Sequence, residues 1–359
     1  WQILCTNFIR TIFKKIKKMD FSIDMLSLGN ADCNIIWTKE ENYDFVTIID
    51  GGNPKDAKTI IEHYESYIKP HISADSPILI INTHPHADHI GGLIDLVHYF
   101  KNKIVRFYYN DPTDYIEEAK RNEIKSLNES FMYSNKRVQK LFASLQQSDN
   151  LSDILEQYSI AKLEAFSDNT LDHNLFEFVG PSKTFYLEQL GYFTNIDNLK
   201  TSGSNIQPES EINEIQEDLN SCDIVDEKND ASAENLTSVL TKFVDSNNRK
   251  YLFTADAGVD SFESAESNGY DIRNLHICQL PHHGSRRNIS TNWVSNFNPK
   301  QFWISANGSK KHPRKAVISC IKKNLPNCNT YSTHKGGNKN INSKSNLFPV
   351  RNWSSAEPM

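Results

Sequence analysis

The segment INTHPHADHIGG at residues 81–92 holds the densest set of side chains able to do chemistry. It follows a continuous apolar run at 78–82, which is typical of a buried strand. Four potential metal ligands fall within six positions: His84, His86, Asp88 and His89. Neutral imidazoles suit zinc and similar transition metals, and a carboxylate adds negative charge. The spacing therefore predicts a metal site at the end of a buried strand.

Three other predicted strands, one before and two after this segment, also end in carboxylate or imidazole side chains. Asp50 ends the strand pattern at 44–50 and precedes two glycines. Asp256 follows the strand pattern at 250–254, and His282 with His283 follow the pattern at 274–280. Taken alone, an Asp after a strand is more often a turn residue or a helix cap, so these positions gain meaning only beside the histidine cluster.

The elements expected to position these groups form two strand–helix halves around a long connection. Further strand patterns occupy 20–28, 34–37, 236–244 and 301–305. Helical patterns occupy 55–68, most of 115–165, and 313–323.

Composition divides the 359 residues into a folded body and several polar segments. The mean hydropathy of −0.57 is polar for a compact protein, and residues 196–234 carry 11 acids against 2 bases. Such a segment cannot bury enough apolar surface to order itself, so we expect a mobile loop there. We predict a domain over 19–330 with insertions at 108–165 and 196–234. Residues 1–18 are predicted to be a peripheral or non-native segment, and 331–359 a basic polar tail.

Cysteine usage and hydropathy point to a cytoplasmic protein. The six cysteines are scattered without a CxxC pair, so we expect all of them to remain thiols in a reducing compartment. No run of 18 or more apolar residues occurs, so no transmembrane helix is expected.

The HxHxDH pattern at 84–89 resembles the signature of the metallo-β-lactamase superfamily. The resemblance implies an α/β fold, a four-layer αββα sandwich of two mixed sheets flanked by helices. It further implies two divalent cations, zinc in the first place and manganese as the alternative. His84 and His86 would bind one cation, Asp88 and His89 the other, and Asp256 would bridge them.

The same resemblance assigns the remaining groups. Asp50 would orient a ligand histidine from behind. One of His282 and His283 would complete the second cation's ligands, with a slight preference for His283, and the other would contact the substrate or the leaving group. A third histidine for the first cation is not evident: His98 lies on a predicted helix surface, and His173 aligns poorly.

Finer details resemble the hydrolase domain of ComEC-type competence proteins. The carrying segments are MLSLGNADCNIIW at 25–37, HHGS at 282–285 and ISANGSKKHP at 304–313. The chain departs from that pattern at Asn30, Ala31 and Ala255, where the family has Gln, Gly and Gly.

The resemblance and the basic residues near the late motifs favour a phosphodiesterase or nuclease that uses a metal-bound hydroxide. Nucleic acid would be the substrate, held by Arg286, Asn307 and His312, because clustered cationic side chains attract a phosphate backbone. The acidic segment opposes this interpretation. Two alternatives therefore stay open: a hydrolase of small phosphoesters, amides or esters, and a regulatory protein with a vestigial metal site.

Overall fold

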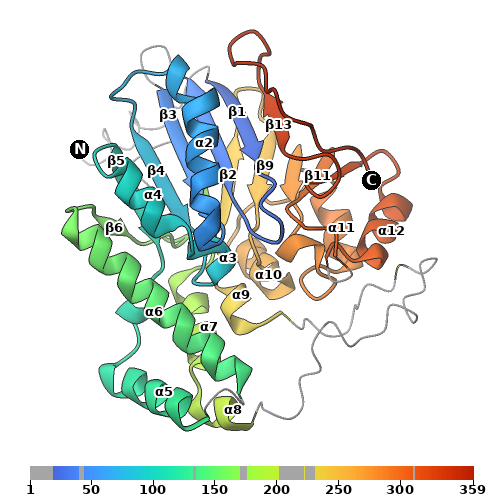
Figure 1. The fold of residues 1–359 in the computed structure, drawn as a ribbon. Helices are drawn as coiled ribbons and strands as arrows, with labels where there is room; N and C mark the ends of the chain where they lie inside the picture. Colours follow the sequence, from blue (N-terminus) through green and yellow to red (C-terminus); the bar gives the residue numbers. More distant parts are fainter. Residues whose placement is uncertain are drawn as a thin grey trace, which may run out of the picture.

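The computed structural model describes residues 19–39, 44–131, 135–169, 176–201, 222, 231–309 and 312–359. Two β-sheets pack face to face, and helices cover their outer sides (Figure 1). Side chains from both sheets, among them Ile81 and Trp303, form the buried layer between them. The predicted αββα architecture of two mixed sheets flanked by helices is therefore confirmed.

The first sheet has seven strands in the order β13-β1-β2-β3-β4-β5-β6. Their bounds are β1 Asp20–Met25, β2 Asn34–Lys39, β3 Asp44–Ile49, β4 Ile78–Asn82, β5 Ile104–Tyr109, β6 Lys162–Leu163 and β13 Lys339–Asn342. β13, β1, β2 and β3 pair antiparallel, whereas β3, β4, β5 and β6 pair parallel.

The second sheet has six strands in the order β12-β11-β10-β9-β8-β7. They are β7 Glu177–Gly180, β8 Leu240–Val244, β9 Lys250–Phe253, β10 Ile277–Gln279, β11 Gln301–Ile304 and β12 Asn329–Ser332. β7, β8 and β9 pair antiparallel, and β9 to β12 pair parallel.

Strand β4 illustrates how the sequence sets these layers. Successive side chains of a strand point to opposite faces. Leu79 and Ile81 pack between the two sheets, whereas Ile78 and Ile80 pack against the outer helices. An apolar run without alternation is thus what a strand buried on both faces requires.

The outer layers are built from helices of very different length. The first sheet is covered by α2 (Ala57–Tyr67), α4 (Leu93–Phe100) and α6 (Lys136–Gln157). The second is covered by α10 (Val259–Ser267), α11 (Thr291–Phe297) and α12 (Lys315–Asn324). The helices predicted at 55–68 and 313–323 are thus present as α2 and α12.

The largely helical pattern predicted over 115–165 is also present. α5 (Glu118–Phe131) and α6 pack with α7 (Lys183–Phe193) and α8 (Ile196–Thr201) around a separate small core, at the bottom of the molecule in Figure 1. Helix α8 occupies the start of the segment that was expected to be an irregular loop. The rest of that loop, 202–221 and 223–230, lies outside the described residues, as do residues 1–18.

The C-terminal segment contains secondary structure that the sequence analysis did not predict. β12 extends the second sheet, and β13 pairs with β1 of the first. Phe348 is buried in the core of the first sheet, and Arg351 binds the buried Asp24 at 2.7 Å. A short polar strand such as KNIN has too few apolar residues to be recognised by pattern.

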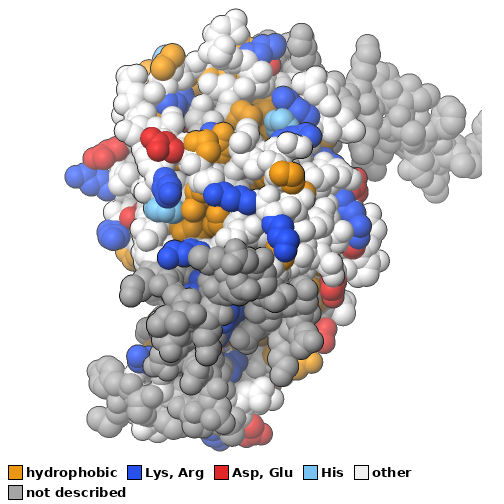
Figure 2. All heavy atoms as spheres, turned by 90° about the vertical axis from the view of Figure 1, so that its right-hand side faces the viewer, with side chains coloured by type: hydrophobic (Ala, Val, Ile, Leu, Met, Phe, Trp, Pro, Cys, Tyr) orange, Lys and Arg blue, Asp and Glu red, His pale blue; other side chains and the backbone are white. Residues whose placement is uncertain are grey.

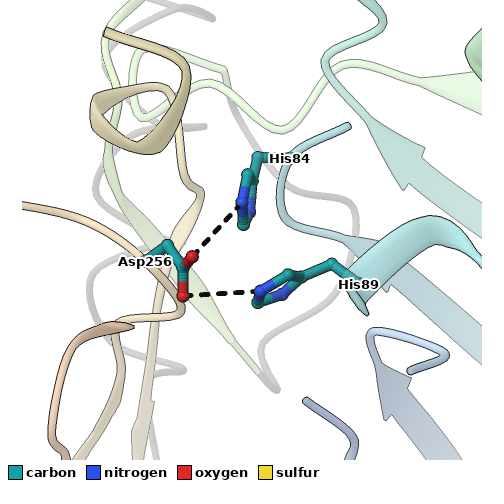
Figure 3. A group of neighbouring side chains, drawn as sticks. All are labelled: His84, His89 and Asp256. Carbon is teal, nitrogen blue, oxygen red and sulfur yellow. Dashed lines mark ion pairs between the residues drawn. The ribbon is translucent and has the colours of Figure 1, made fainter. Parts of the chain in front are cut away.

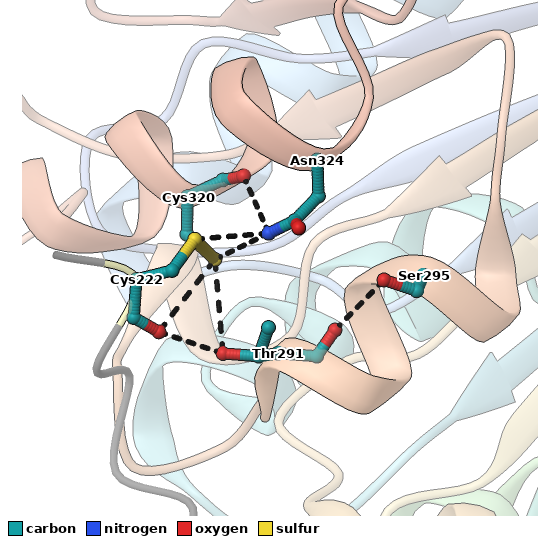
Figure 4. The surroundings of a disulfide bond; sticks show 5 residues. All are labelled: Cys222, Thr291, Ser295, Cys320 and Asn324. Atoms are coloured by element: carbon teal, nitrogen blue, oxygen red, sulfur yellow. Dashed lines mark hydrogen bonds between the residues drawn. A yellow bond between two sulfur atoms is a disulfide. The ribbon is translucent and has the colours of Figure 1, made fainter.

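A disulfide joins Cys222 to Cys320 of α12, so the prediction that all six cysteines remain thiols is wrong (Figure 4). The hydroxyl of Thr291 donates to the carbonyl oxygen of Cys222 at 2.7 Å, and Asn324 lies against both sulfur atoms. The two cysteines are 98 residues apart, a pairing that no local spacing encodes.

Among the described residues, no helix is both long and apolar enough to cross a membrane.

Candidate metal centre

The site lies where loops from both sheets meet. β4 leads into His84, and the short helix α3 (Ala87–Ile90) follows His86 directly. The turn behind α3 needs glycine: a Cβ on Gly92 would lie 2.2 Å from the carbonyl oxygen of Gly51. From the second sheet, β9 leads to Asp256, and β10 leads to the 3-10 turn η6 (His282–Gly284).

Asp256 is the centre of the cluster. Its Oδ2 lies 3.7 Å from Nε2 of His84, and its Oδ1 lies 3.4 Å from Nε2 of His89. Figure 3 shows the two histidines pointing at different oxygens of this carboxylate. The carboxylate, only 1% exposed, therefore separates two groups of donor atoms, as a bridging ligand would.

The donor group on the Oδ1 side contains His89, His283 and Asp88. Nε2 of His283 lies 3.5 Å from Oδ2 of Asp88 and 3.9 Å from Oδ1 of Asp256. Ligand atoms that share one tetrahedral zinc at about 2.0–2.2 Å lie about 3.3–3.6 Å from one another. The spacing of this group is thus close to that of a zinc ligand set.

The protonation of the two imidazoles also suits a cation. His89 donates from Nδ1 to Asp50 at 2.8 Å, and His283 donates from Nδ1 to the carbonyl oxygen of Ser305 at 2.9 Å. When neutral, each ring therefore presents a bare Nε2 lone pair to Asp256. These Nε2 atoms and Oδ1 of Asp256 are buried without a hydrogen bond to any described residue. Several acceptors facing each other in a dry site require a cation or added protons.

The donor group on the Oδ2 side contains His84 and His86. Nε2 of His84 lies 3.1 Å from Nδ1 of His86, and both side chains are almost fully buried. Among the described residues between the HxHxDH segment and Asp256, no third histidine joins them. His98 is exposed and contacts Tyr158, and His173 lies outside the described residues.

Asp50 supports both groups from behind. Its Oδ2 accepts from His89 and from the hydroxyl of Thr83, and its Oδ1 accepts from the backbone N–H of Thr83. Because the Thr83 hydroxyl donates to Asp50, its oxygen is free to accept from Nδ1 of His84, 3.1 Å away. One carboxylate therefore fixes the tautomer of one histidine in each group.

The pKa values follow from burial and from these contacts. Burial lowers the pKa of His84 well below its usual range and that of His86 to about 3. Burial acts in the same direction on His283, but the carboxylates of Asp88 and Asp256 outweigh it and raise its pKa to about 9. For His89, burial is likewise outweighed by Asp256 and Asp50, and the pKa rises. Negative charge is thus concentrated on the Oδ1 side.

His282 lies on the other side of Asp256 from His283. Its Nε2 is 3.6 Å from Oδ2 of Asp256, the oxygen that faces His84. Its Nδ1 is 2.9 Å from Oδ1 of Asn288, whose amide nitrogen donates to two backbone carbonyls. The amide nitrogen of Asn235 lies 3.1 Å from the same Nδ1, so the ring is held between two asparagine side chains. Its Nε2 is thereby directed into the site, toward Asp256.

Four residues around the site have a left-handed backbone, with φ of 63° at Asp50, 46° at Ala255, 47° at His282 and 57° at His283. L-residues adopt this region at a cost of about 1–2 kcal/mol. Such strain is typical of functional sites. Ala255 stands where the resembling family has a glycine, which would adopt this φ freely.

The three residues predicted to hold substrate differ in their positions. His312 is buried, and its ring centre lies 5.2 Å from that of His282. Arg286 is half-buried, three residues beyond His283. Asn307 is exposed, and its side-chain oxygen accepts from the backbone N–H of Ser309. The structure thus brings His312 to the cluster and engages Asn307 in its own turn.

Sequence reasoning missed Asp32, Asn288 and Gln279. Oδ2 of Asp32 accepts from the amide of Gln279 at 2.5 Å, and Oδ1 lies 3.5 Å from Nδ1 of His283. Asp32 could have been found from its position in the opening motif at 25–37. The sequence analysis used that motif only for its departures at Asn30 and Ala31.

Comparison with known proteins finds a family similarity for the first part of the chain. Residues 28–125 match the family model of the metallo-beta-lactamase superfamily. The matched stretch contains Asp50 and the ligand cluster at 84–89, whereas Asp256, His282 and His283 lie beyond it. This part of the chain is thus similar to the metallo-β-lactamase superfamily, and the two mixed sheets flanked by helices are consistent with that fold.

Among solved structures, AidC, described as a dizinc quorum-quenching lactonase, is similar over 91% of this chain and 79% of its own. The identity is 15% and the TM-score is 0.34. No curated protein matches the chain.

Proposed function

We propose that this protein is a metal-dependent hydrolase that binds two divalent cations, with zinc as the first choice and manganese as the alternative. The observation that carries this proposal is the convergence of bare imidazole nitrogens and carboxylate oxygens on Asp256, several of them without a hydrogen bond to any described residue. A vestigial site would not need to keep so many buried acceptors together.

Each donor group would hold one cation. His84 and His86 would bind the first with Oδ2 of Asp256, and Asp88, His89 and His283 would bind the second with Oδ1. When bound, two such cations lower the pKa of a water nucleophile and neutralise the attacking and leaving oxygens. Asp88, whose side chain is 32% exposed, lies at the open edge of the site, where it would orient that water.

His282 would act on the leaving group. Its side chain is 22% exposed, and its Nδ1 lies between Asn288 and Asn235, so Nε2 is directed toward the site. When protonated at Nε2, such an imidazole would donate that proton to a departing oxygen, and His312 beside it would contact a substrate oxygen. Direct binding of the first cation by His282 is the other role consistent with its distance from Asp256.

The substrate proposed is a phosphodiester, with a nucleic acid preferred over a small molecule. Arg286 and Arg287 directly follow the HHGS segment, and a guanidinium can bind a phosphate through two hydrogen bonds. Figure 2 views the side on which α12 and the C-terminus lie in Figure 1, and Lys and Arg side chains are more frequent there than Asp and Glu. The resemblance to ComEC-type domains points the same way.

The depth of the site favours one alternative. His84, His89 and Asp256 are each at most 1% exposed, so the reacting group must enter past Asp88 and His282. A flexible single strand or a small ester can do this more easily than a rigid duplex. A hydrolase of small phosphoesters, amides or esters is therefore the second candidate.

A substrate panel in the presence of zinc or manganese tests the proposal. It comprises labelled single- and double-stranded DNA and RNA, bis(p-nitrophenyl) phosphate, and simple ester, lactone and amide substrates. We expect the wild type to cleave single strands and the phosphodiester, Asp88→Ala to lose that activity, and His98→Ala, a histidine outside the site, to keep it. Cleavage of esters or amides alone would select the second candidate. No turnover of any substrate by protein loaded with two cations would refute the hydrolase proposal.

A further inference from the structure

Asp32 is a buried carboxylate that touches both halves of the proposed metal centre. It lies between β1 and β2 and is only 1% exposed. Its backbone N–H donates to the carbonyl oxygen of Asp88 at 3.0 Å, and its carbonyl oxygen accepts from Gly52 at 3.0 Å. Both contacts belong to the first sheet. Its side chain instead reaches the second sheet, at Gln279 and His283.

One hydrogen bond does not satisfy this carboxylate. Oδ2 accepts from Gln279, but Oδ1 is buried without a hydrogen bond to any described residue. Asp32 also has ligand-type atoms close to Asp256 and Asp50, which carry the same charge. An uncompensated buried carboxylate is expensive, so positive charge is required nearby.

The charge balance of the cluster indicates where that positive charge belongs. Four carboxylates surround the histidines: Asp32, Asp50, Asp88 and Asp256. Together they carry four negative charges when ionised, which equals the charge of two divalent cations. Asp50 faces Nδ1 of His89, and Asp32 faces Nδ1 of His283, so each carboxylate lies on the side of the ring opposite Nε2.

We propose that Asp32 is a positioning residue for the second cation, which it serves by holding His283. Oδ1 of Asp32 faces Nδ1 of His283, the nitrogen that donates to Ser305, while Nε2 points toward Asp88 and Asp256. When Nε2 binds a cation, the N–H at Nδ1 becomes more positive, and the carboxylate at 3.5 Å stabilises it. This inference rests on the metal centre proposed above.

The test measures metal binding rather than turnover. Asp32→Asn keeps the shape of the side chain and removes its charge. Stepwise affinities would be measured for wild type and variant by competition with a chromophoric chelator, and cobalt substituted for zinc would report each position through its visible spectrum. Removing a carboxylate partner of a metal-bound histidine typically weakens metal binding 10–100-fold. We expect that loss for the second equivalent only, with the first equivalent unchanged.

Asp245→Asn is the matched control. Asp245 is also 1% exposed, but it pairs with Arg249, and no ligand of the proposed site contacts it among the described residues. This control is expected to lower the melting temperature while keeping both cations.

The outcomes separate the two proposals. Selective loss of the second equivalent and of its cobalt spectrum supports the role of Asp32. Two equivalents bound as in wild type, or equal weakening of both, would overturn it while leaving the hydrolase proposal intact. Wild-type protein that binds no cation at all would overturn both proposals together.

Discussion

Replacing Asp50 by Asn tests whether this carboxylate orients the histidines of the proposed metal centre. The carboxylate accepts three hydrogen bonds, two at Oδ2 and one at Oδ1. An amide has one oxygen, so in either orientation its NH₂ faces a group that now donates. If the oxygen stays on the backbone N–H of Thr83, the NH₂ faces Nδ1 of His89. That ring then keeps its proton on Nε2, the nitrogen that would bind the proposed cation.

The magnitude follows from these contacts. Loss of a carboxylate partner of a metal-bound histidine weakens affinity by about 10–100-fold, or about 1.4–2.8 kcal/mol. Asp50 contacts His89 directly and His84 through the hydroxyl of Thr83. We therefore expect both cation affinities to fall, the second more than the first. Asp32→Asn, in contrast, should affect the second alone.

The assay is chelator competition on metal-free protein, accompanied by a thermal melt of the same sample. The melt is needed because losing buried charged hydrogen bonds also destabilises the fold, by about 1.5–3 kcal/mol per bond. Folded Asp50→Asn protein with both affinities within twofold of wild type would refute the argument that this carboxylate sets the histidine tautomers.

Three further predictions concern stability. Ala255→Gly should raise the free energy of unfolding by about 0.5–1 kcal/mol, because its φ of 46° suits glycine; an unchanged or lower value in urea unfolding would contradict this. Cys320→Ser should lower it by about 2–5 kcal/mol, and reduction of the wild type should reproduce the variant's melting curve. Asp24→Asn should lower it by about 3 kcal/mol near neutral pH. Although burial raises the pKa of Asp24, His63 and Arg351 lower it below 3.8, so the carboxylate stabilises the fold above that pH. The difference in free energy of unfolding between wild type and variant should shrink as the pH falls through the lowered pKa of Asp24. Urea unfolding at several pH values measures this difference, and a difference that does not change with pH would contradict the prediction.

Local sequence patterns predicted much of the fold and many of the residues that the structure brings together at the candidate site. The apolar run of β4 and the HxHxDH spacing both depend on neighbours within a few residues, so they are readable from the chain. The structure places Asp256 and the late histidines beside that cluster, as the order of the motifs implied. Helix α2 follows from i, i+3 and i+4 apolar spacing, and α12 from a segment after the last predicted strand in which Pro313 suits a first helical turn.

The parts that were missed depend on contacts between distant residues. Asp32 meets Gln279 across 247 positions, and Cys222 meets Cys320 across 98, so no local pattern marks either pair. β13 is recognisable only by its pairing with β1, because its own side chains are mostly polar. Asn307 was singled out by its place in the late motif of the resembling family, but its side-chain oxygen is engaged in its own turn, which only the backbone path determines.

The division of the donor atoms between the two sheets links cation binding to the stability of the whole sandwich. His84, His86, Asp88 and His89 come from the first sheet, whereas Asp256 and His283 come from the second. A cation that needs donors from both binds only the state in which the sheets are docked. At a free concentration one hundred times its dissociation constant, such a ligand adds about 2.7 kcal/mol to the free energy of unfolding. A chelator would then act on this protein as a mild denaturant, because removing the cations would weaken the packing between the two sheets, to which Ile81 and Trp303 contribute.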